Sequence, residues 1–122
     1  MKLHESTENY LETIYILLKR KGTIRAIDIA HELGFSKPSV SVAMKNLREL
    51  HYIETDSHGS ITLTEEGRAI AEDIHERHEI LCKGLIALGV QEDTASSDAC
   101  RIEHVISEES FRAIKDYIRR KW

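Results

Sequence analysis

One pair of neighbouring helical segments limits the fold of this chain more than any other feature. Apolar side chains recur at helical spacing over 25–33, and Gly34 follows, where a left-handed backbone that ends a helix costs least. Ser36 then provides an N-cap for a second helix over 37–50, with Pro38 in its first turn, where no hydrogen bond is lost. Two short helices joined by a tight glycine turn are typical of a helix-turn-helix.

The segments around this pair complete the pattern of a winged helix. An amphipathic helix is expected over 7–19, and the recognition helix spans 36–50. Alternating residues over 52–55 and 61–63, joined by a polar turn that contains glycine, predict a small β-hairpin. This hairpin is the expected wing.

The second half of the chain is expected to be helical. Thr64 is a good N-cap for one long helix that reaches about residue 88, and further helices fit 91–106 and 108–121. The fold class is therefore mainly α: an N-terminal winged helix-turn-helix with a small hairpin, followed by a helical part. No Pro/Gly/Ser-rich linker is visible, so the boundary near residue 64 is interpreted as a hinge between packed units.

Composition excludes several classes of protein. With 122 residues, 41% of them hydrophobic and 31% charged, one Pro and six Gly, the chain is a helix-rich globule rather than a disordered or fibrous one. No apolar run approaches the about 18–20 residues of a membrane span, and the first residues lack the profile of a secretory signal. We therefore expect a cytoplasmic protein with no membrane partner. Two cysteines give no disulfide framework.

Charge is distributed unevenly along the chain. The net charge is −4, but residues 1–64 carry eight Lys/Arg and eight Asp/Glu, whereas residues 65–122 carry nine and thirteen. The overall charge argues against an indiscriminate nucleic-acid binder. A surplus of carboxylates beside histidines in the second half suits a divalent cation, although a solvated acidic surface explains the charge equally well.

Three residue types that bind metals lie close together near the C-terminus. On a helix, Cys100, Glu103 and His104 fall on one face, within about 100° of arc. A thiolate, a carboxylate and an imidazole together suit Fe²⁺, Mn²⁺, Co²⁺ or Zn²⁺, whereas Mg²⁺ and Ca²⁺ prefer oxygen alone. The alternative is a helix that presents its Cys to the core and its Glu and His to water.

Two more such residues, His78 and Cys82, lie one turn apart on the preceding long helix. Cys82 stands in an apolar run and is interpreted as a core thiol rather than a ligand, whereas His78 fits either role. His75 is interpreted as a surface residue.

Five segments, in order along nearly the whole chain, resemble the metal-dependent transcriptional repressors of the diphtheria toxin repressor and manganese transport regulator family. The segments are Thr7–Tyr15, Ser36–Ser41, Leu63–Gly67, Arg77–Leu81 and Asp98–Ser107.

The resemblance implies a winged-helix DNA-binding domain over 1–70 and a helical metal-binding and dimerisation domain over 71–122. It also implies a metal site that joins the two domains, with Fe²⁺ or Mn²⁺ as the ion and Zn²⁺ or Co²⁺ as substitutes. The ligands, carried over position by position, are Asn9, Glu12, His78, Cys100, Glu103 and His104.

This ligand set combines features of two branches of the family. Glu12 resembles the manganese branch and Cys100 the iron branch, while Asn9 stands where these branches have an acid or a methionine. Cys82 replaces an acid that the iron branch uses in an ancillary site, which argues against a second site of the iron type. A binuclear centre of the manganese type is the alternative.

For DNA, the resemblance points to the start of the recognition helix. The residues expected at base edges, where short side chains permit a close approach, are Ser36, Pro38 and Ser39. The residues expected to contact phosphates are Arg25, Lys37, Ser41 and Lys45. Val42 occupies a place where some relatives carry a base-reading glutamine.

Together these patterns predict a homodimeric, metal-activated repressor that binds double-stranded operator DNA. The alternative is a winged-helix regulator that responds to an organic ligand or to thiol oxidation through Cys82 and Cys100. A small metalloenzyme, with Glu103 as a general base beside a bound ion, is not expected, because the chain has no glycine-rich phosphate loop and no His-Glu-x-x-His motif. No small organic substrate is expected either.

Overall fold

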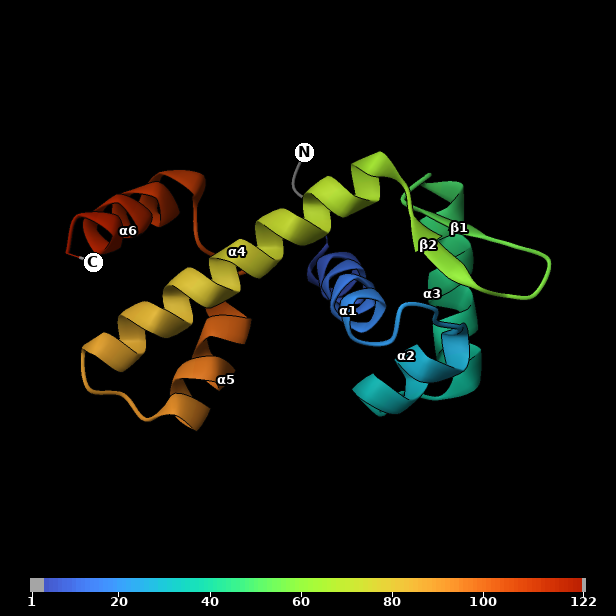
Figure 1. The fold of residues 1–122 in the computed structure, drawn as a ribbon, viewed down its shortest axis with the longest axis horizontal. Coiled ribbons are helices and arrows are strands. Elements are labelled where there is room, and N and C mark those ends of the chain that lie inside the picture. Colours follow the sequence, from blue (N-terminus) through green and yellow to red (C-terminus); the bar gives the residue numbers. More distant parts are fainter. Residues whose placement is uncertain (1–3, 122) are drawn as a thin grey trace. The chain divides into compact units, whose positions relative to one another are not determined.

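The computed structural model describes residues 4–121. The chain forms two compact units, of which the first ends at Glu72 and the second begins at Asp73. This boundary falls inside one continuous helix, α4 (Glu65–Ala87), which can be followed in Figure 1. Within residues 4–121, no helix combines the length and the hydropathy that a membrane crossing requires.

The N-terminal unit is a winged helix. Its elements in chain order are α1 (Glu5–Lys21), α2 (Ala26–Leu33), α3 (Lys37–Glu49), β1 (Ile53–Thr55), β2 (Ile61–Leu63) and the start of α4 (Figure 1). The two strands pair antiparallel, with Ile53 opposite Leu63. The helices and the hairpin predicted for this half of the chain are confirmed, and each boundary lies within two residues of the expected one.

Every element of this unit contributes apolar side chains to one core. Along α1 and α3 these residues recur every three or four positions, which puts them on one face of each helix. In the hairpin, successive side chains point to opposite sides, and one of these sides is buried. The almost fully buried members are Leu11, Ile14, Leu17, Ile24, Ile29, Val40, Met44, Leu47, Ile53 and Ile61.

Local chemistry sets the helix ends of the helix-turn-helix. Gly34 adopts a φ of 70° and donates its backbone N–H to the Ala30 carbonyl oxygen at 2.9 Å, a left-handed stop that costs glycine little. The Ser36 hydroxyl accepts a hydrogen bond from the Ser39 backbone N–H at 3.3 Å. The predicted glycine stop and serine N-cap are both confirmed.

Hydrogen bonds and close packing connect the start of α4 to the turn that precedes the hairpin. The Thr64 hydroxyl donates to the His51 carbonyl oxygen at 2.7 Å and accepts from the Gly67 backbone N–H at 3.1 Å. At Gly67 the helix passes so close to Tyr52 that a β-carbon would lie 2.0 Å from the Tyr52 carbonyl oxygen. Only glycine fits at this position.

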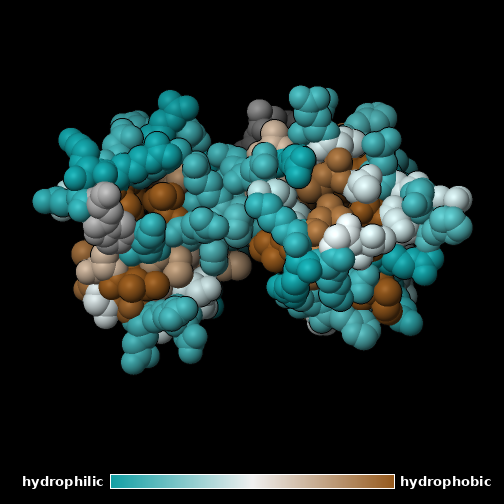
Figure 2. Space-filling model, in the orientation of Figure 1, coloured by the Kyte–Doolittle hydropathy of each residue, from teal (hydrophilic) through white to brown (hydrophobic). Residues whose placement is uncertain are grey.

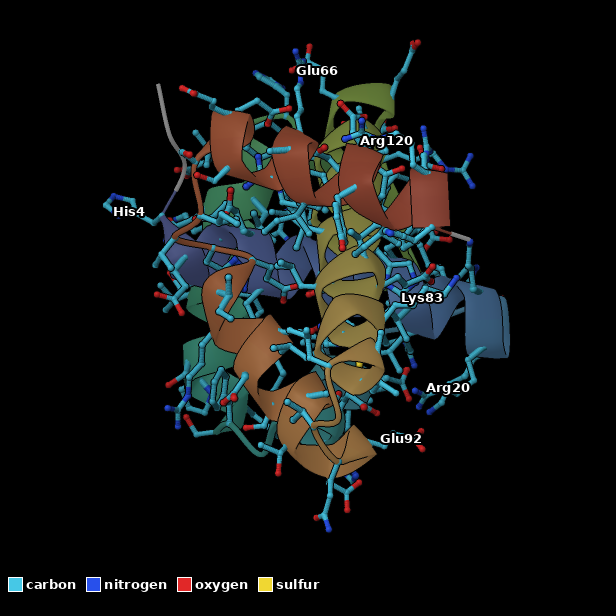
Figure 3. All side chains as sticks on the ribbon, turned by 90° about the vertical axis from the view of Figure 1, so that its left-hand side faces the viewer. His4, Arg20, Glu66, Lys83, Glu92 and Arg120 are labelled. Atoms are coloured by element: carbon cyan, nitrogen blue, oxygen red, sulfur yellow. The ribbon has the colours of Figure 1, made fainter. Side chains whose placement is uncertain are left out.

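The C-terminal unit contains the rest of α4 together with α5 (Glu92–Ile102) and α6 (Glu108–Lys121), which lie on different sides of α4 (Figure 1). Figure 3 shows the three helices from another side, with the labelled Lys83, Glu92 and Arg120 on their outside. The buried apolar residues of this unit are Ile74, Leu81, Ala95, Ala99, Phe111 and Ile118.

The helix predicted over 91–106 is wrong at its C-terminal end. α5 ends at Ile102, and Glu103 occupies the C-cap. Beyond this point the Glu103 and Ile106 carbonyl oxygens accept hydrogen bonds from the Arg77 guanidinium, at 3.5 and 3.1 Å. A side chain from another helix therefore contacts this turn, and the spacing of apolar residues does not encode that contact.

We expect Gly67→Ala to lower the free energy of unfolding by at least about 1–3 kcal/mol, because the new methyl group overlaps the Tyr52 backbone. Urea denaturation measures the change. Arg68→Ala is the control, since this neighbouring side chain is exposed and its loss should change stability by no more than about 0.5 kcal/mol. Equal stability of the two variants would contradict the close approach.

Candidate metal centre and DNA-binding face

Two imidazoles of the C-terminal unit lie beside one buried carboxylate, and all three are side chains of types that bind metals. His78 lies in α4, while Glu103 and His104 lie in the turn after α5. His78 Nδ1 is 3.4 Å from Glu103 Oε2, and His104 Nε2 is 3.4 Å from Glu103 Oε1. The two imidazoles thus flank the carboxylate, one at each oxygen.

The Glu103 carboxylate is buried without the hydrogen bonds that a buried anion requires. Its side chain is 0% exposed, and within residues 4–121 neither oxygen has a hydrogen-bond partner. Burial of a carboxylate is costly unless hydrogen bonds or opposite charge compensate for the lost water. A divalent cation supplies that compensation, and one carboxylate with two imidazoles suits Mn²⁺, Fe²⁺, Co²⁺ or Zn²⁺. The residues present therefore fit a metal ion.

The two cysteines are less enclosed than Glu103 and His104. Cys100 is exposed in the last turn of α5, and Cys82 is partly buried in α4. The expectation that Cys100 shares one helical face with Glu103 and His104 required the helix to continue through 104. Because α5 ends at Ile102, that premise is wrong.

The two ligands expected from the N-terminal half, Asn9 and Glu12, lie on α1 about one turn apart. Glu12 is buried, which is unusual for a charged side chain. The Asn9 carbonyl oxygen accepts a hydrogen bond from the Thr13 hydroxyl at 2.8 Å. Both residues belong to the N-terminal unit, whereas the other four expected ligands belong to the C-terminal unit.

All seven residues expected to contact DNA are exposed, and all belong to the N-terminal unit. Six of them lie on α3 or at its N-cap. Lys37, Ser41 and Lys45 follow at intervals of four residues, so they share one face of the helix. The hydroxyls of Ser36 and Ser39 are joined by a hydrogen bond of 2.8 Å. The N-terminal part of α3 thus presents hydroxyl and basic groups to solvent.

Arg25, the seventh, makes a structural contact that the sequence does not indicate. Its Nη2 donates a hydrogen bond to the His58 carbonyl oxygen in the hairpin turn, and its guanidinium fills the space beside Gly59. The Arg25 backbone N–H donates to the Asp28 carboxylate at 2.8 Å, and this bond, followed by one from Lys21, lowers the pKa of Asp28. Arg25 therefore connects the start of α2 to the hairpin.

Arg77 contacts the turn of the candidate metal centre, and reasoning from the sequence missed it. It precedes His78 in α4, its side chain is only 12% exposed, and it donates to carbonyl oxygens of the turn that carries Glu103 and His104. An arginine on an amphipathic helix is normally expected at the surface. The spacing of residues in the sequence therefore did not predict that Arg77 contacts this turn.

Comparison with known proteins gives matches along both units. The model of the iron-dependent repressor N-terminal DNA-binding domain matches residues 2–60. The model of the iron-dependent repressor metal-binding and dimerisation domain matches residues 64–120.

Individual relatives agree with these matches. The transcriptional regulator MntR of Escherichia coli O6:H1 is 36% identical over 111 residues, which cover 91% of this chain and 72% of the relative. An uncharacterised HTH-type transcriptional regulator of Methanocaldococcus jannaschii is 33% identical over 118 residues, which cover 95% of this chain and 94% of the relative.

Solved structures give the same result. A manganese-dependent transcriptional repressor in complex with manganese has a TM-score of 0.82 to this chain at 26% identity, over 91% of this chain and 51% of that one. This chain thus spans about half the length of that structure. The resemblance found in the sequence is confirmed, and the chain belongs to the iron-dependent repressor family of transcriptional regulators.

Proposed function

We propose that this protein is a metal-activated repressor, in which a divalent cation bound at Glu103 controls the binding of α3 to operator DNA. The observation that carries the proposal is the buried Glu103 carboxylate, which lies between His78 and His104 and has no hydrogen-bond partner within residues 4–121. The bound ion supplies positive charge at this carboxylate. Residues 1–70 form the DNA-binding domain, and residues 71–122 form the metal-binding and dimerisation domain.

The proposed ligand set draws on both units. His78, Glu103 and His104 form its centre, and their arrangement within the C-terminal unit supports this assignment. The remaining proposed ligands, which complete the coordination sphere, are Asn9 and Glu12 from α1 and Cys100 from α5. Because the ligands come from both units, ion occupancy restricts how the DNA-binding unit moves relative to the other.

Mn²⁺ or Fe²⁺ is the proposed activating ion, with Zn²⁺ or Co²⁺ as substitutes. The carboxylates of Glu12 and Glu103 favour the harder Mn²⁺, whereas the thiolate of Cys100 favours the softer Fe²⁺. Both carboxylate residues are buried and Cys100 is exposed, which supports Mn²⁺. A solved relative of similar fold is itself a complex with manganese.

Operator DNA is the proposed partner of the exposed N-terminal part of α3. The small side chains of Ser36, Pro38 and Ser39 permit close approach to base edges in the major groove. Val42 is 61% exposed on the same helix and offers an apolar surface to a thymine methyl group. The proposed phosphate contacts are Arg25, Lys37, Ser41 and Lys45.

A homodimer would present two copies of α3 to one palindromic operator. Two half-sites that are one duplex turn apart require the two recognition helices to stand about 34 Å apart. Figure 2 shows apolar side chains among charged groups on one face of the protein. Within residues 73–121 of the C-terminal unit, four large hydrophobic side chains are exposed, which supports self-association. They are Ile86, Leu88, Val105 and Tyr117. We place the protein in the cytoplasm, with the DNA that it binds.

Metal binding and DNA binding are linked in this proposal. If the ion favours the arrangement of the dimer that fits the operator, operator DNA must raise the affinity for the ion by the same factor. A coupling free energy of about 1–3 kcal/mol, typical of allosteric proteins, corresponds to a factor of about 5–150 in affinity.

The first test measures DNA affinity with and without metal, on palindromic sites selected from a random library in the presence of Mn²⁺. Fluorescence anisotropy should show affinity about 5–150-fold higher with Mn²⁺ than with a chelator. Equal affinity in the two conditions would overturn the proposal. In the Cys82→Ser variant, Mn²⁺ should still raise the affinity for DNA. If this variant no longer responds to Mn²⁺, the thiol-responsive alternative is favoured.

The Glu103→Gln variant tests whether Glu103 binds the metal ion or only stabilises the fold. The amide keeps the shape and removes the buried charge, so we expect the metal-free variant to be at least as stable as the native chain and Mn²⁺ to add no stability. Thermal unfolding with and without Mn²⁺ measures both. Glu109→Gln, at an exposed glutamate, should retain stabilisation by Mn²⁺. A destabilised Glu103→Gln chain that still responds to Mn²⁺ would refute the assignment.

Glu12→Gln tests the link between the units. Since His78, Glu103 and His104 are intact, the variant should still bind Mn²⁺ in calorimetry, but Mn²⁺ should no longer raise its affinity for the selected DNA site. Glu5→Gln, at an exposed position of the same helix, is the matched control and should behave as the native chain does. Native coupling in Glu12→Gln would remove Glu12 from the ligand set.

A further inference from the structure

The guanidinium group of Arg77 connects several parts of the C-terminal unit. Its Nη1 donates to the Glu103 and Ile106 carbonyl oxygens at 3.5 and 3.1 Å, and its Nη2 donates to Glu108 Oε2 at 2.6 Å. The ring of Phe111 lies against the guanidinium, with 5.2 Å between Arg77 Cζ and the ring centroid. These contacts use the planar, five-donor group of arginine in several directions at once.

Arg77 contacts the turn that carries two residues of the proposed metal centre. Glu103 and His104 begin the turn, and Ile106 lies near its end, so the two accepted carbonyls bracket both ligands. In α4, Arg77 directly precedes His78, the third ligand. One side chain therefore connects the turn that carries Glu103 and His104 to the helix that carries His78.

We propose that Arg77 is a positioning residue of the metal centre, which holds the turn so that Glu103 and His104 face His78 before an ion arrives. This inference rests on the proposed function, because it concerns the same three ligands. Partners of this kind orient metal ligands from outside the coordination sphere, and their loss weakens metal binding by about 10- to 100-fold.

The carboxylate of Glu108 keeps Arg77 in place from the start of α6. A hydrogen bond from Arg112 at 3.0 Å, together with the charge of Arg77, holds the pKa of Glu108 below its usual range. A glutamate is ionised at neutral pH even at its ordinary pKa, so this carboxylate remains a strong acceptor for Arg77 with or without Arg112. Arg112 itself is exposed and reaches Glu108 from its own helix.

The test uses the full chain, with Arg77→Lys and Arg77→Gln as variants and Arg112→Gln as the control. Lysine keeps the positive charge but cannot reach two carbonyls and a carboxylate together. Arg112→Gln removes the other cation at Glu108 and leaves the bonds of Arg77 to the turn. Three quantities are measured: the dissociation constant for Co²⁺, the ligand-field absorption of bound Co²⁺, and amide hydrogen exchange in the metal-free protein.

We expect both Arg77 variants to bind Co²⁺ about 10- to 100-fold more weakly than the native chain, with an altered ligand-field spectrum. Without metal, the amides of Val105 and Ile106, which both donate to the Ile102 carbonyl oxygen, should exchange faster. Arg112→Gln should match the native chain in all three measurements.

Native affinity, spectrum and exchange in Arg77→Lys would overturn the inference. Weaker binding with an unchanged spectrum and unchanged exchange would also overturn it, because a general effect of charge then suffices. Should neither Arg77 variant fold, Glu108→Gln, which weakens the anchor of Arg77, is expected to give the same changes at smaller size. A native chain that binds no Co²⁺ would refute the metal centre itself, while hydrogen exchange would still decide whether Arg77 holds the turn.

Discussion

A buried carboxylate between two imidazoles is the interaction on which the rest of this structure depends. Glu103 lies with His78 at one oxygen and His104 at the other, and within residues 4–121 neither oxygen accepts a hydrogen bond. Such a group destabilises a fold unless something compensates for its charge. The guanidinium of Arg77 donates to two carbonyl oxygens of the turn after α5, and in our proposal these bonds hold Glu103 and His104 in this arrangement.

In the N-terminal unit, α1 packs in the same core as α3, so a displacement of α1 is transmitted to α3. Leu11 and Ile14 of α1 share one close-packed core with Val40 and Met44 of α3. Packed cores transmit displacement because they contain little free volume. A ligand at position 12 of α1, as proposed, would therefore act on the recognition helix through side chains that are already in contact.

Much of the fold follows from local sequence rules, and the differences have identifiable physical causes. Gly34, Ser36 and Thr64 set helix ends through their own backbone or hydroxyl groups, so a single sequence was enough to predict those ends. The turn that follows α5 instead accepts hydrogen bonds from Arg77, which is far away in the chain. The contact of Arg25 with the hairpin turn is likewise a tertiary contact that no local pattern encodes.

The most direct test of the central claim is anomalous diffraction from crystals of the protein grown with Mn²⁺. We expect a strong anomalous peak within coordination distance of a Glu103 oxygen and of imidazole nitrogens of His78 and His104. A peak at another place in the structure would contradict the proposed site. The absence of any peak at saturating Mn²⁺ would also contradict it, provided that the crystal shows Glu103 between His78 and His104.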